Sequence, residues 1–430
     1  MPSTLKLGLT DRGAQPADLN AYFSRYHEAP MLSHLQFRGE KDGQWFPLAE
    51  TQDRSVSELQ GLLRDFGFYP QGDVDGIFGY RTLSAVRLFQ EYVRTVEGRS
   101  EIGTPDGIAG PNTNAHLQRW RSDQLRAEWT RFSADSPSPA YRYWMEVLKN
   151  FQQMSATPPI SRILQMIDLS SPGTDTLTVR NWRFNPHDLH LVGIRRQEWR
   201  STHEREDDDL FVLLVNGSAF VFFGSTDPNP RMADRPDEPY IVRGQHRYRF
   251  GWHKLSDLRR VYRAFRPFGH GVLICRDSTR DDAFTDADLA SGLKPNGTIN
   301  IHWSGIGTSN WSAGCQVIAG ERYVNHSGRK IDCTPWAART YVDLPGKTRA
   351  AFSVLLDLLT VFATDISVQG GSPLYYTVLY ERDLGYQVNP TQTLAAAALA
   401  ALGQIAGANL ATLSDSISVD TLVNRLIRNG

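Results

Sequence analysis

The chain has 430 residues, of which 40% are hydrophobic and 11% aromatic, and its formal net charge is −1. This length and composition are sufficient for about three domains with packed cores. The balanced charge provides no basic field for a nucleic acid, so that class of partner is excluded. The three cysteines, Cys275, Cys315 and Cys333, leave one unpaired in any pairing, so we expect no disulfide framework.

The first predicted domain covers residues 51–121, after an N-terminal extension over residues 1–50. Apolar residues recur at helical spacing from Val56 to Phe66 and again from Thr82 to Val93. The sequence Asp-Gly-Ile occurs twice, at 75–77 and 106–108, and a predicted helix follows each copy. We therefore expect an internally similar unit of three helices.

This segment resembles the small peptidoglycan-binding domain, which implies peptidoglycan as a partner. The matching residues are Leu59, Gln60, Val74 to Gly79, Thr82, Ala85, Val86, Phe89, Gln90 and Asp106 to Thr113. The apolar ones among them are expected in the core. Asp75 and Asp106 are expected as turn and helix-cap groups. A glycan-contacting groove would involve exposed positions such as Tyr80 and Arg81.

Residues 122–187 predict a helical connector, broken at the Ser/Pro-rich stretch 136–139 and again at 157–159. His187 and His190 could serve as metal ligands on a helix, but they stand in a loop-like stretch without a suitable third ligand. We therefore expect no metal site and no cofactor.

From residue 188 to 385 the chain predicts a β-rich domain, which makes the whole a multidomain α+β protein. The stretch 210–224 forms a predicted hairpin about Asn216-Gly217, a dipeptide that favours the twist of such a connection. Polar strand faces follow around Arg243, His246, Arg247 and Arg249. Arginine suits the binding of peptide carboxylates, so Arg247 is a candidate substrate contact, with a surface role as the alternative.

The most informative chemistry lies at His302 and Cys315. Side-chain alternation in residues 298–305 places Asn300, His302 and Ser304 on one face of a predicted strand. Turn-forming residues from Gly305 to Asn310 let Cys315 return beside this strand. A thiol with a pKa of about 8.5 needs a neighbouring imidazole to become nucleophilic at neutral pH. We expect a catalytic cysteine, with a buried structural cysteine near a core histidine as the alternative.

The sequence Ser-Ala-Gly-Cys at 312–315, after an Ile-His strand, resembles the active-site signature of the L,D-transpeptidase family with the YkuD-type fold. The resemblance covers residues 188–385 and implies that Cys315 is the acyl-accepting nucleophile and His302 the base. It further implies Ser312 and Gly314 as corner residues and the backbone of Ser304 or Trp303 as the group that orients the imidazole. The small corner leaves room for a substrate carbonyl and for N–H groups facing an oxyanion.

The match departs from the family at Ala313, where a second histidine is usual, and in a short loop between His302 and Cys315. The choice between hydrolysis and transfer therefore stays open. Trp303, Asn310 and Trp311 are further candidate substrate contacts. The main alternative base is His270, which stands between two glycines but outside the strand-loop-cysteine pattern.

The predicted helical tail, residues 386–430, contains a stretch of about twenty uncharged residues rich in alanine. We expect it to mediate oligomerisation or docking on a phage-tail or injection-system particle, with membrane insertion as the alternative. The N-terminus has neither a basic nor an apolar signal region, so no signal peptide is expected. An enzyme for the cell wall would then be released by lysis or delivered by a phage or a secretion machine.

The sequence thus predicts a peptidoglycan-targeted cysteine enzyme that forms a thioester with a stem peptide at an L,D bond. Resolution by water makes it an L,D-carboxypeptidase or endopeptidase, and resolution by an amine makes it a transpeptidase. The alternatives are a non-catalytic wall-binding component of a phage or injection particle and a cysteine peptidase acting on protein. The preferred stem peptide and the oligomeric state are not determined by the sequence.

Overall fold

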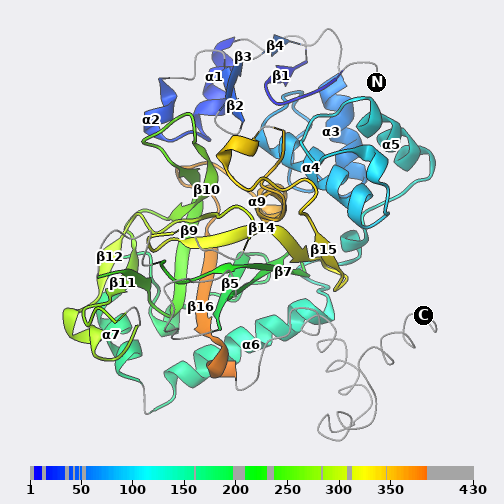
Figure 1. Cartoon of the computed structure of the whole chain (residues 1–430). Helices are drawn as coiled ribbons and strands as arrows, with labels where there is room; N and C mark the ends of the chain where they lie inside the picture. The colour runs from blue at the N-terminus through cyan, green and yellow to red at the C-terminus, as the bar shows by residue number, and fades with distance from the viewer. Residues whose placement is uncertain are drawn as a thin grey trace, which may run out of the picture.

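The computed structural model describes residues 4–11, 16–33, 38–41, 44–47, 49–50, 55–158, 161–196, 209–229, 237–281, 284–307, 312–344 and 346–384. Helices of the N-terminal part lie on one side of a β-rich body (Figure 1). The α+β character predicted from the sequence is therefore confirmed. The predicted tail lies outside the described residues, and within those residues no helix is long and apolar enough to cross a membrane.

The helical region contains α3 (Ser55–Asp65), α4 (Tyr80–Thr95) and α5 (Pro111–Ser122), so the three predicted helices are present. Their apolar faces meet around Trp120, whose ring lies 5.3 Å from Phe89 and 5.5 Å from Phe66 between ring centroids. Pro111 begins α5, where its fixed φ is compatible with a first helical turn and its missing N–H costs nothing.

Two buried glutamines organise the repeated turns of this region in the same way. Gln60 Nε2 contacts Asp75 Oδ1, the Ile77 carbonyl and Thr82 Oγ1 at 2.8, 3.0 and 3.1 Å, and Gln60 Oε1 accepts from Gly76 N–H at 2.9 Å. Gln90 makes the matching contacts with Asp106, Ile108, Thr113 and Gly107 at 3.1, 3.0, 3.0 and 2.8 Å. The internal similarity of the segment is thus a repeated hydrogen-bond network.

Asp75 and Asp106 fulfil the turn half of their predicted role. Each Oδ1 accepts a hydrogen bond from the backbone N–H two residues later, at 2.9 Å in the first turn and 2.8 Å in the second. The helix-cap half of the prediction is wrong, because Gly79 and Gly110 occupy the N-cap positions of α4 and α5. The carboxylates are used within the turns, which lie several residues before the helices begin.

The N-terminal extension contributes to the same helical unit. Leu5 exchanges backbone hydrogen bonds with Ala109 at 3.1 and 2.8 Å, and β1 (Leu9–Thr10) leads to Asp11, whose N–H donates to the Gly76 carbonyl at 2.8 Å. The Asp11 carboxylate accepts from Val56 N–H and Ser57 N–H at the start of α3, both at 3.0 Å. This N-terminal segment therefore contacts both repeated turns.

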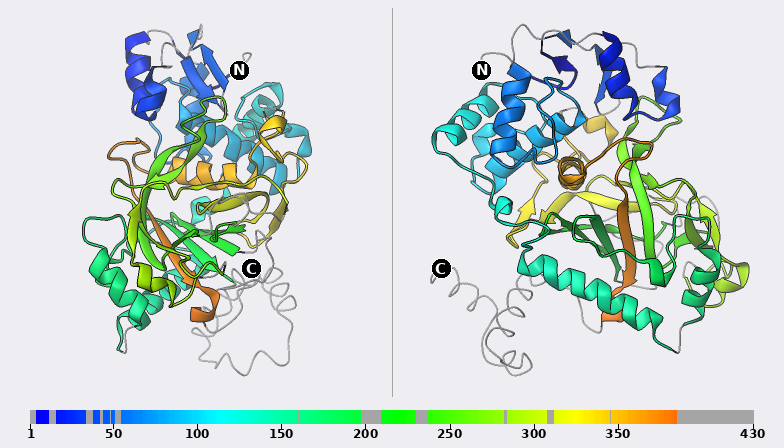
Figure 2. Two further views of the ribbon diagram at one scale, coloured as in Figure 1. Left: turned by 60° about the vertical axis from the view of Figure 1, so that its left-hand side comes forward. Right: turned by 180° about the vertical axis from the view of Figure 1, so that it is seen from behind.

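Between β1 and α3 lie short elements that complete the N-terminal part. They are α1 (Pro16–Ser24), α2 (Ala29–Leu32), the antiparallel pair β2 (Arg38–Lys41) and β3 (Gln44–Pro47), and β4 (Ala49–Glu50), which pairs with β1. The connector after α5 carries α6 (Pro139–Ala156) and α7 (Arg162–Ser170). Figure 2 shows α6 along the side of the body away from α3, α4 and α5.

The body is a closed barrel. Its strands are β5 (Leu189–Arg195), β6 (Asp209–Val215), β7 (Ser218–Ser225), β9 (Gly244–His253), β10 (Tyr262–Pro267), β13 (Ile301–Trp303), β14 (Gln316–Val324) and β16 (Leu374–Tyr380). They follow the order β13-β10-β9-β16-β5-β6-β7-β14, and a parallel pairing of β13 with β14 closes the ring. Such closure removes the exposed edges of these strands.

Smaller elements surround the barrel. The strand β15 (Lys330–Asp332) extends the sheet beyond β14, and β8 (Pro239–Ile241), β11 (Val272–Arg276) and β12 (Lys294–Asn296) form a separate sheet. The predicted hairpin at Asn216-Gly217 is confirmed by the pairing of β6 with β7. Both turn residues have positive φ, 44° and 75°, as a two-residue hairpin loop requires.

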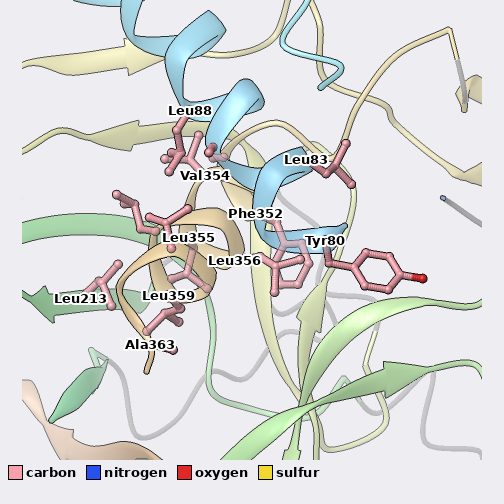
Figure 3. Close-up of a cluster of buried hydrophobic side chains, with 14 of the residues drawn as sticks. Tyr80, Leu83, Leu88, Leu213, Phe352, Val354, Leu355, Leu356, Leu359 and Ala363 are labelled. Carbon is pink, nitrogen blue, oxygen red and sulfur yellow. The ribbon is translucent and has the colours of Figure 1, made fainter. Parts of the chain in front are cut away.

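The helix α9 (Ala351–Phe362) joins the two parts of the molecule. All its residues from Ala351 to Val361 are buried, and it packs between α4 and strands of the barrel (Figure 3). Arg87 of α4 makes two hydrogen bonds to the Asp357 carboxylate, at 2.8 and 2.6 Å. Nearby, the Tyr323 hydroxyl of β14 donates to Glu91 of α4. The helical region and the barrel therefore share a buried interface.

Candidate active site

A cavity of about 580 Å³ lies where β13 and β14 meet. Five of the residues predicted for the site line it: His302, Trp303, Ser304, Ser312 and Cys315. Asn310 and Trp311 lie outside the described residues. The barrel thus brings the predicted cysteine and histidine to one cavity.

Cys315 is positioned by the parallel pairing of β13 with β14. In this register Ile301 lies opposite Gln316 and His302 opposite Val317, which places Cys315 next to Asn300. The Cys315 Sγ accepts from Asn300 N–H and donates to the Thr298 carbonyl, both at 3.3 Å. Because alternate residues of a strand share a face, Asn300, His302 and Cys315 project to the same side of the sheet.

The His302 imidazole is held by a backbone carbonyl. Its Nδ1 lies 2.8 Å from the Trp303 oxygen, which only accepts, so Nδ1 carries the proton and Nε2 carries the lone pair of the neutral ring. The Tyr262 hydroxyl lies 3.2 Å from the same Nδ1 and donates to the Trp303 oxygen at 3.3 Å. This arrangement leaves Nε2 as the basic atom. The Trp303 carbonyl makes the orienting contact, whereas Ser304 N–H pairs with Ile318.

Burial determines the protonation states of the pair. It lowers the pKa of His302 to about 4, against a smaller opposing effect of the Trp303 carbonyl. Burial also raises the pKa of the Cys315 thiol, although the Asn300 N–H and the charge of Lys254 act in the opposite direction. At neutral pH the resting site therefore holds a thiol beside a neutral imidazole. Such an imidazole can take the thiol proton as the sulfur attacks.

A second imidazole, His253 at the end of β9, also lines the cavity. Its ring stacks on His302, with 4.0 Å between centroids and 16° between planes. Its Nδ1 lies 3.1 Å from the Asn300 side-chain nitrogen, and burial together with His302 lowers its pKa. This residue was not predicted from the sequence. Its only signal was the alternation of polar residues along β9, because the pairing of β9, β10 and β13 is not visible in the sequence.

The corner before Cys315, residues 312–314, has the tight geometry that its small residues predict. Gly314 has φ 137°, and a Cβ there would lie 2.5 Å from Pro239 Cγ, so a side chain would be strained and crowded. The Ser312 hydroxyl donates to the Cys315 carbonyl at 2.8 Å and accepts from Gly314 N–H at 3.1 Å. Ala313 is exposed beside them. Ser312 and Gly314 thus shape the turn that carries Cys315.

Tyr80 and Arg81 were predicted as exposed positions of a glycan-contacting groove, and this exposure is wrong, because Tyr80 is buried and Arg81 is half-buried. Tyr80 is only 1% exposed, and its hydroxyl lies 2.6 Å from His27 Nε2. Arg81 donates to the carbonyls of Ala363 and Thr364 at 2.6 and 3.3 Å. Tyr80 also packs against Trp252 of β9, and Arg81 reaches the segment that follows α9, so this end of α4 lies at the interface with the body.

Arg247 and His270 also lie away from the cavity lining. The Arg247 guanidinium pairs with Asp175 at 3.3 Å and lies over the Phe268 ring, so it is held outside this cavity, and its role as a substrate contact stays a prediction. The His270 side chain is exposed, and its backbone N–H donates to Asp175 at 2.7 Å. Cations at the cavity come instead from Lys254, Arg260, Arg276 and Arg339, none of which the sequence analysis selected.

Comparison with known proteins identifies one part of the chain. A family model described as "Putative peptidoglycan binding domain" matches residues 52–97, which contain α3, the first repeated turn and α4. The helical region therefore contains a peptidoglycan-binding domain, which supports peptidoglycan as a partner. No curated protein and no solved structure matches the chain. The resemblance of the barrel to L,D-transpeptidases gains no support from these comparisons and stays a prediction.

Proposed function

We propose that this protein is a peptidoglycan-directed cysteine acyl enzyme. The observation that carries the proposal is the placement of Cys315 and His302 on one face of adjacent strands, lining one cavity, with the imidazole Nε2 left basic by the Trp303 carbonyl. The peptidoglycan-binding domain at residues 52–97 supports the cell wall as the target. Delivery to the wall by lysis, a phage or a secretion machine is part of the proposal.

The proposed reaction begins with attack of Cys315 Sγ on a stem-peptide carbonyl at an L,D bond. An S–C bond forms, the C–N bond breaks, and His302 carries the thiol proton to the departing amine. Water then cleaves the thioester and releases a carboxylic acid, as in an L,D-carboxypeptidase or endopeptidase. If an amine cleaves it, a new peptide bond forms, as in a transpeptidase. Either route restores the thiol.

A non-catalytic wall-binding protein is the second candidate, and the state of the thiol favours it. Burial raises the pKa of Cys315, and the thiol donates to the Thr298 carbonyl, as a structural cysteine would. The two candidates differ in reactivity. The other cysteines have less exposed side chains, and burial raises the pKa of Cys275 to about 11 and also raises that of Cys333. A catalytic Cys315 should react rapidly with a thiol reagent at neutral pH, whereas equally slow reaction of all three cysteines would support the non-catalytic candidate.

The decisive experiment is mass spectrometry of purified peptidoglycan fragments after incubation with the wild type and with Cys315→Ala, with a D-amino acid added to one arm. Loss of a terminal D-alanine with the wild type alone would support hydrolysis, and its exchange would support transfer. Unchanged fragments in every arm, together with intact binding to cell walls, would support the non-catalytic candidate. A parallel digestion of casein tests action on protein.

A further inference from the structure

The cavity beside Cys315 is lined by charges of one sign. Lys254, Arg260, Arg276 and Arg339 contribute four cations, and the described lining residues include no aspartate or glutamate. The whole chain carries a net charge of −1, so this concentration is local. A cavity with walls of one sign attracts ligands of the opposite sign.

Two of the four cations are partly neutralised by neighbouring residues. Arg260 lies 3.6 Å from the Asp257 carboxylate, and Arg276 lies 3.8 Å from the Asp237 carboxylate. Lys254 and Arg339 are both exposed, and neither side chain lies within 4.0 Å of a carboxylate among the residues that the structure describes. The Asp343 carboxylate is nearby, where it accepts a hydrogen bond from the Arg339 backbone N–H at 2.7 Å. These two side chains are therefore available to a ligand carboxylate.

Lys254 is the lining cation whose charge acts on both proposed reacting groups. It follows His253 directly and has φ 61°, a backbone conformation that a residue with a side chain rarely adopts. Its charge lowers the pKa of Cys315, His302 and His253 alike, so it acts on the whole site. A ligand group held at Lys254 would thus lie near the sulfur.

Arg339 reaches the cavity from a different segment, just before the short 3-10 helix Tyr341–Asp343. A Cβ at Gly305 would lie 2.4 Å from the Arg339 carbonyl, so the backbone carrying this arginine packs against the chain that leaves β13. The guanidinium presents paired N–H donors, which match a carboxylate. Two segments therefore supply cations to one cavity.

We propose that Lys254 and Arg339 bind a carboxylate of the acyl donor and make the cavity selective for anionic peptides. The assignment of this ligand as the acyl donor rests on the proposed function, because it places the carboxylate beside Cys315. The carboxylate could be the C-terminal one or one on a side chain. If it is terminal, the site acts at the ends of stem peptides.

The test is binding to the full-length Cys315→Ala variant, which does not consume the ligand. The probes are a stem tetrapeptide ending in D-alanine, its C-terminal amide, and the form with its side-chain carboxylate amidated, each titrated by calorimetry. We expect the free acid to bind about tenfold more tightly than one of the two amides, with a smaller ratio at high salt. The amide that loses affinity identifies the carboxylate.

In the Cys315→Ala background, a second substitution, Lys254→Gln or Arg339→Gln, should remove most of the preference for the free acid. Lys254→Arg should retain this preference. Arg259→Ala is the matched control, because Arg259 is adjacent to Arg260, its side chain is 93% exposed, and it does not line the cavity. A melting temperature for each variant verifies folding. Equal affinity for all three peptides, no measurable binding, or a preference that survives both glutamine substitutions would overturn the proposal.

The result separates this proposal from the proposed function. Selective binding of the free-acid peptide by Cys315→Ala, with no turnover by the wild type, would support the carboxylate site and refute the proposed enzymatic activity. Turnover of the free-acid peptide and both amides at equal rates by the wild type would support the enzymatic activity and refute the carboxylate site.

Discussion

The peptidoglycan-binding region and the barrel are built from contacts of different range. In the helical region each organising glutamine bonds to partners within 23 residues along the chain, and the same network occurs twice. In the barrel the cavity combines residues from β9, β13, the corner that precedes β14 and the segment at Arg339. The helical network repeats a local motif, and the cavity depends on the closure of the whole sheet.

A family model matches residues 52–97 of the first region, whereas the barrel has only a short motif in its favour. A local network requires particular residues at fixed spacing, so it leaves a pattern in the sequence. A barrel site requires only that several strands converge, and many sequences satisfy that requirement. The two regions nevertheless meet at α9, so their stabilities are expected to be coupled.

In the barrel, the largest effect is expected at His302, because the proposed reaction depends on its imidazole. Replacing it with alanine removes the proposed base, and the rate of peptide cleavage should fall by roughly 10³-fold. Release of D-alanine from stem peptides measures the effect. His270→Ala is the matched control, because that side chain is exposed and does not line the cavity. An equal loss in both variants would contradict the assignment.

The coupling of the two regions depends on the buried pair Arg87 and Asp357, whose side chains are 10% and 2% exposed. Asp357→Ala leaves the guanidinium buried without this partner and should lower the free energy of unfolding by roughly 4 kcal/mol. The double variant Arg87→Met/Asp357→Leu should recover most of that loss. Urea denaturation measures both, with exposed Asp286→Ala as the control. A double variant as unstable as the single one would argue against a paired role.

The same interface should respond to pH through Glu91. Burial raises its pKa from 4.5 to about 7, against the opposing effect of the Tyr323 hydroxyl. The folded protein holds this proton more tightly than the unfolded chain, so stability falls as pH rises from 4.5 through 7. Glu91→Gln should therefore be more stable than the wild type at pH 8, by roughly 3 kcal/mol. In urea denaturation this difference should disappear below pH 4.5, and a difference that is constant with pH would refute the mechanism.

In the helical region, the two repeated networks predict equal losses of stability when either glutamine is replaced. Gln60→Ala and Gln90→Ala each leave a buried glycine N–H without its acceptor, and each should lower the free energy of unfolding by roughly 2 kcal/mol. Gln118→Ala, in the exposed part of α5, should change little. Chemical denaturation of the full chain gives all three values. Clearly unequal losses at the two glutamines would show that the repeats are not energetically equivalent.

The smallest effect is expected at Tyr262. Tyr262→Phe removes the hydroxyl that contacts His302 Nδ1 and the Trp303 carbonyl, while the main contact between those two remains. We expect kcat to fall about fivefold, equivalent to about 1 kcal/mol, with KM unchanged. Steady-state kinetics measures this split. A change in KM alone would indicate that Tyr262 contacts the substrate instead.

By itself, the sequence determined the features that are encoded over short distances. Periodicity and the repeated Asp-Gly-Ile turns were sufficient for the three helices, and Asn216-Gly217 was sufficient for the hairpin. Alternation placed His302 on the polar face of its strand, and the small residues before Cys315 indicated the tight corner. These features depend on backbone geometry within one or two turns of chain.

Only the tertiary structure decided which distant residues meet. The closure of β13 on β14 placed Cys315 beside Asn300, and the order of strands placed His253 against His302. Packing against Phe23 of the N-terminal extension and Trp252 of β9 buried Tyr80, which a helical pattern alone left exposed. Strand order and docking depend on the summed free energy of many weak long-range contacts, so no short stretch of sequence records them.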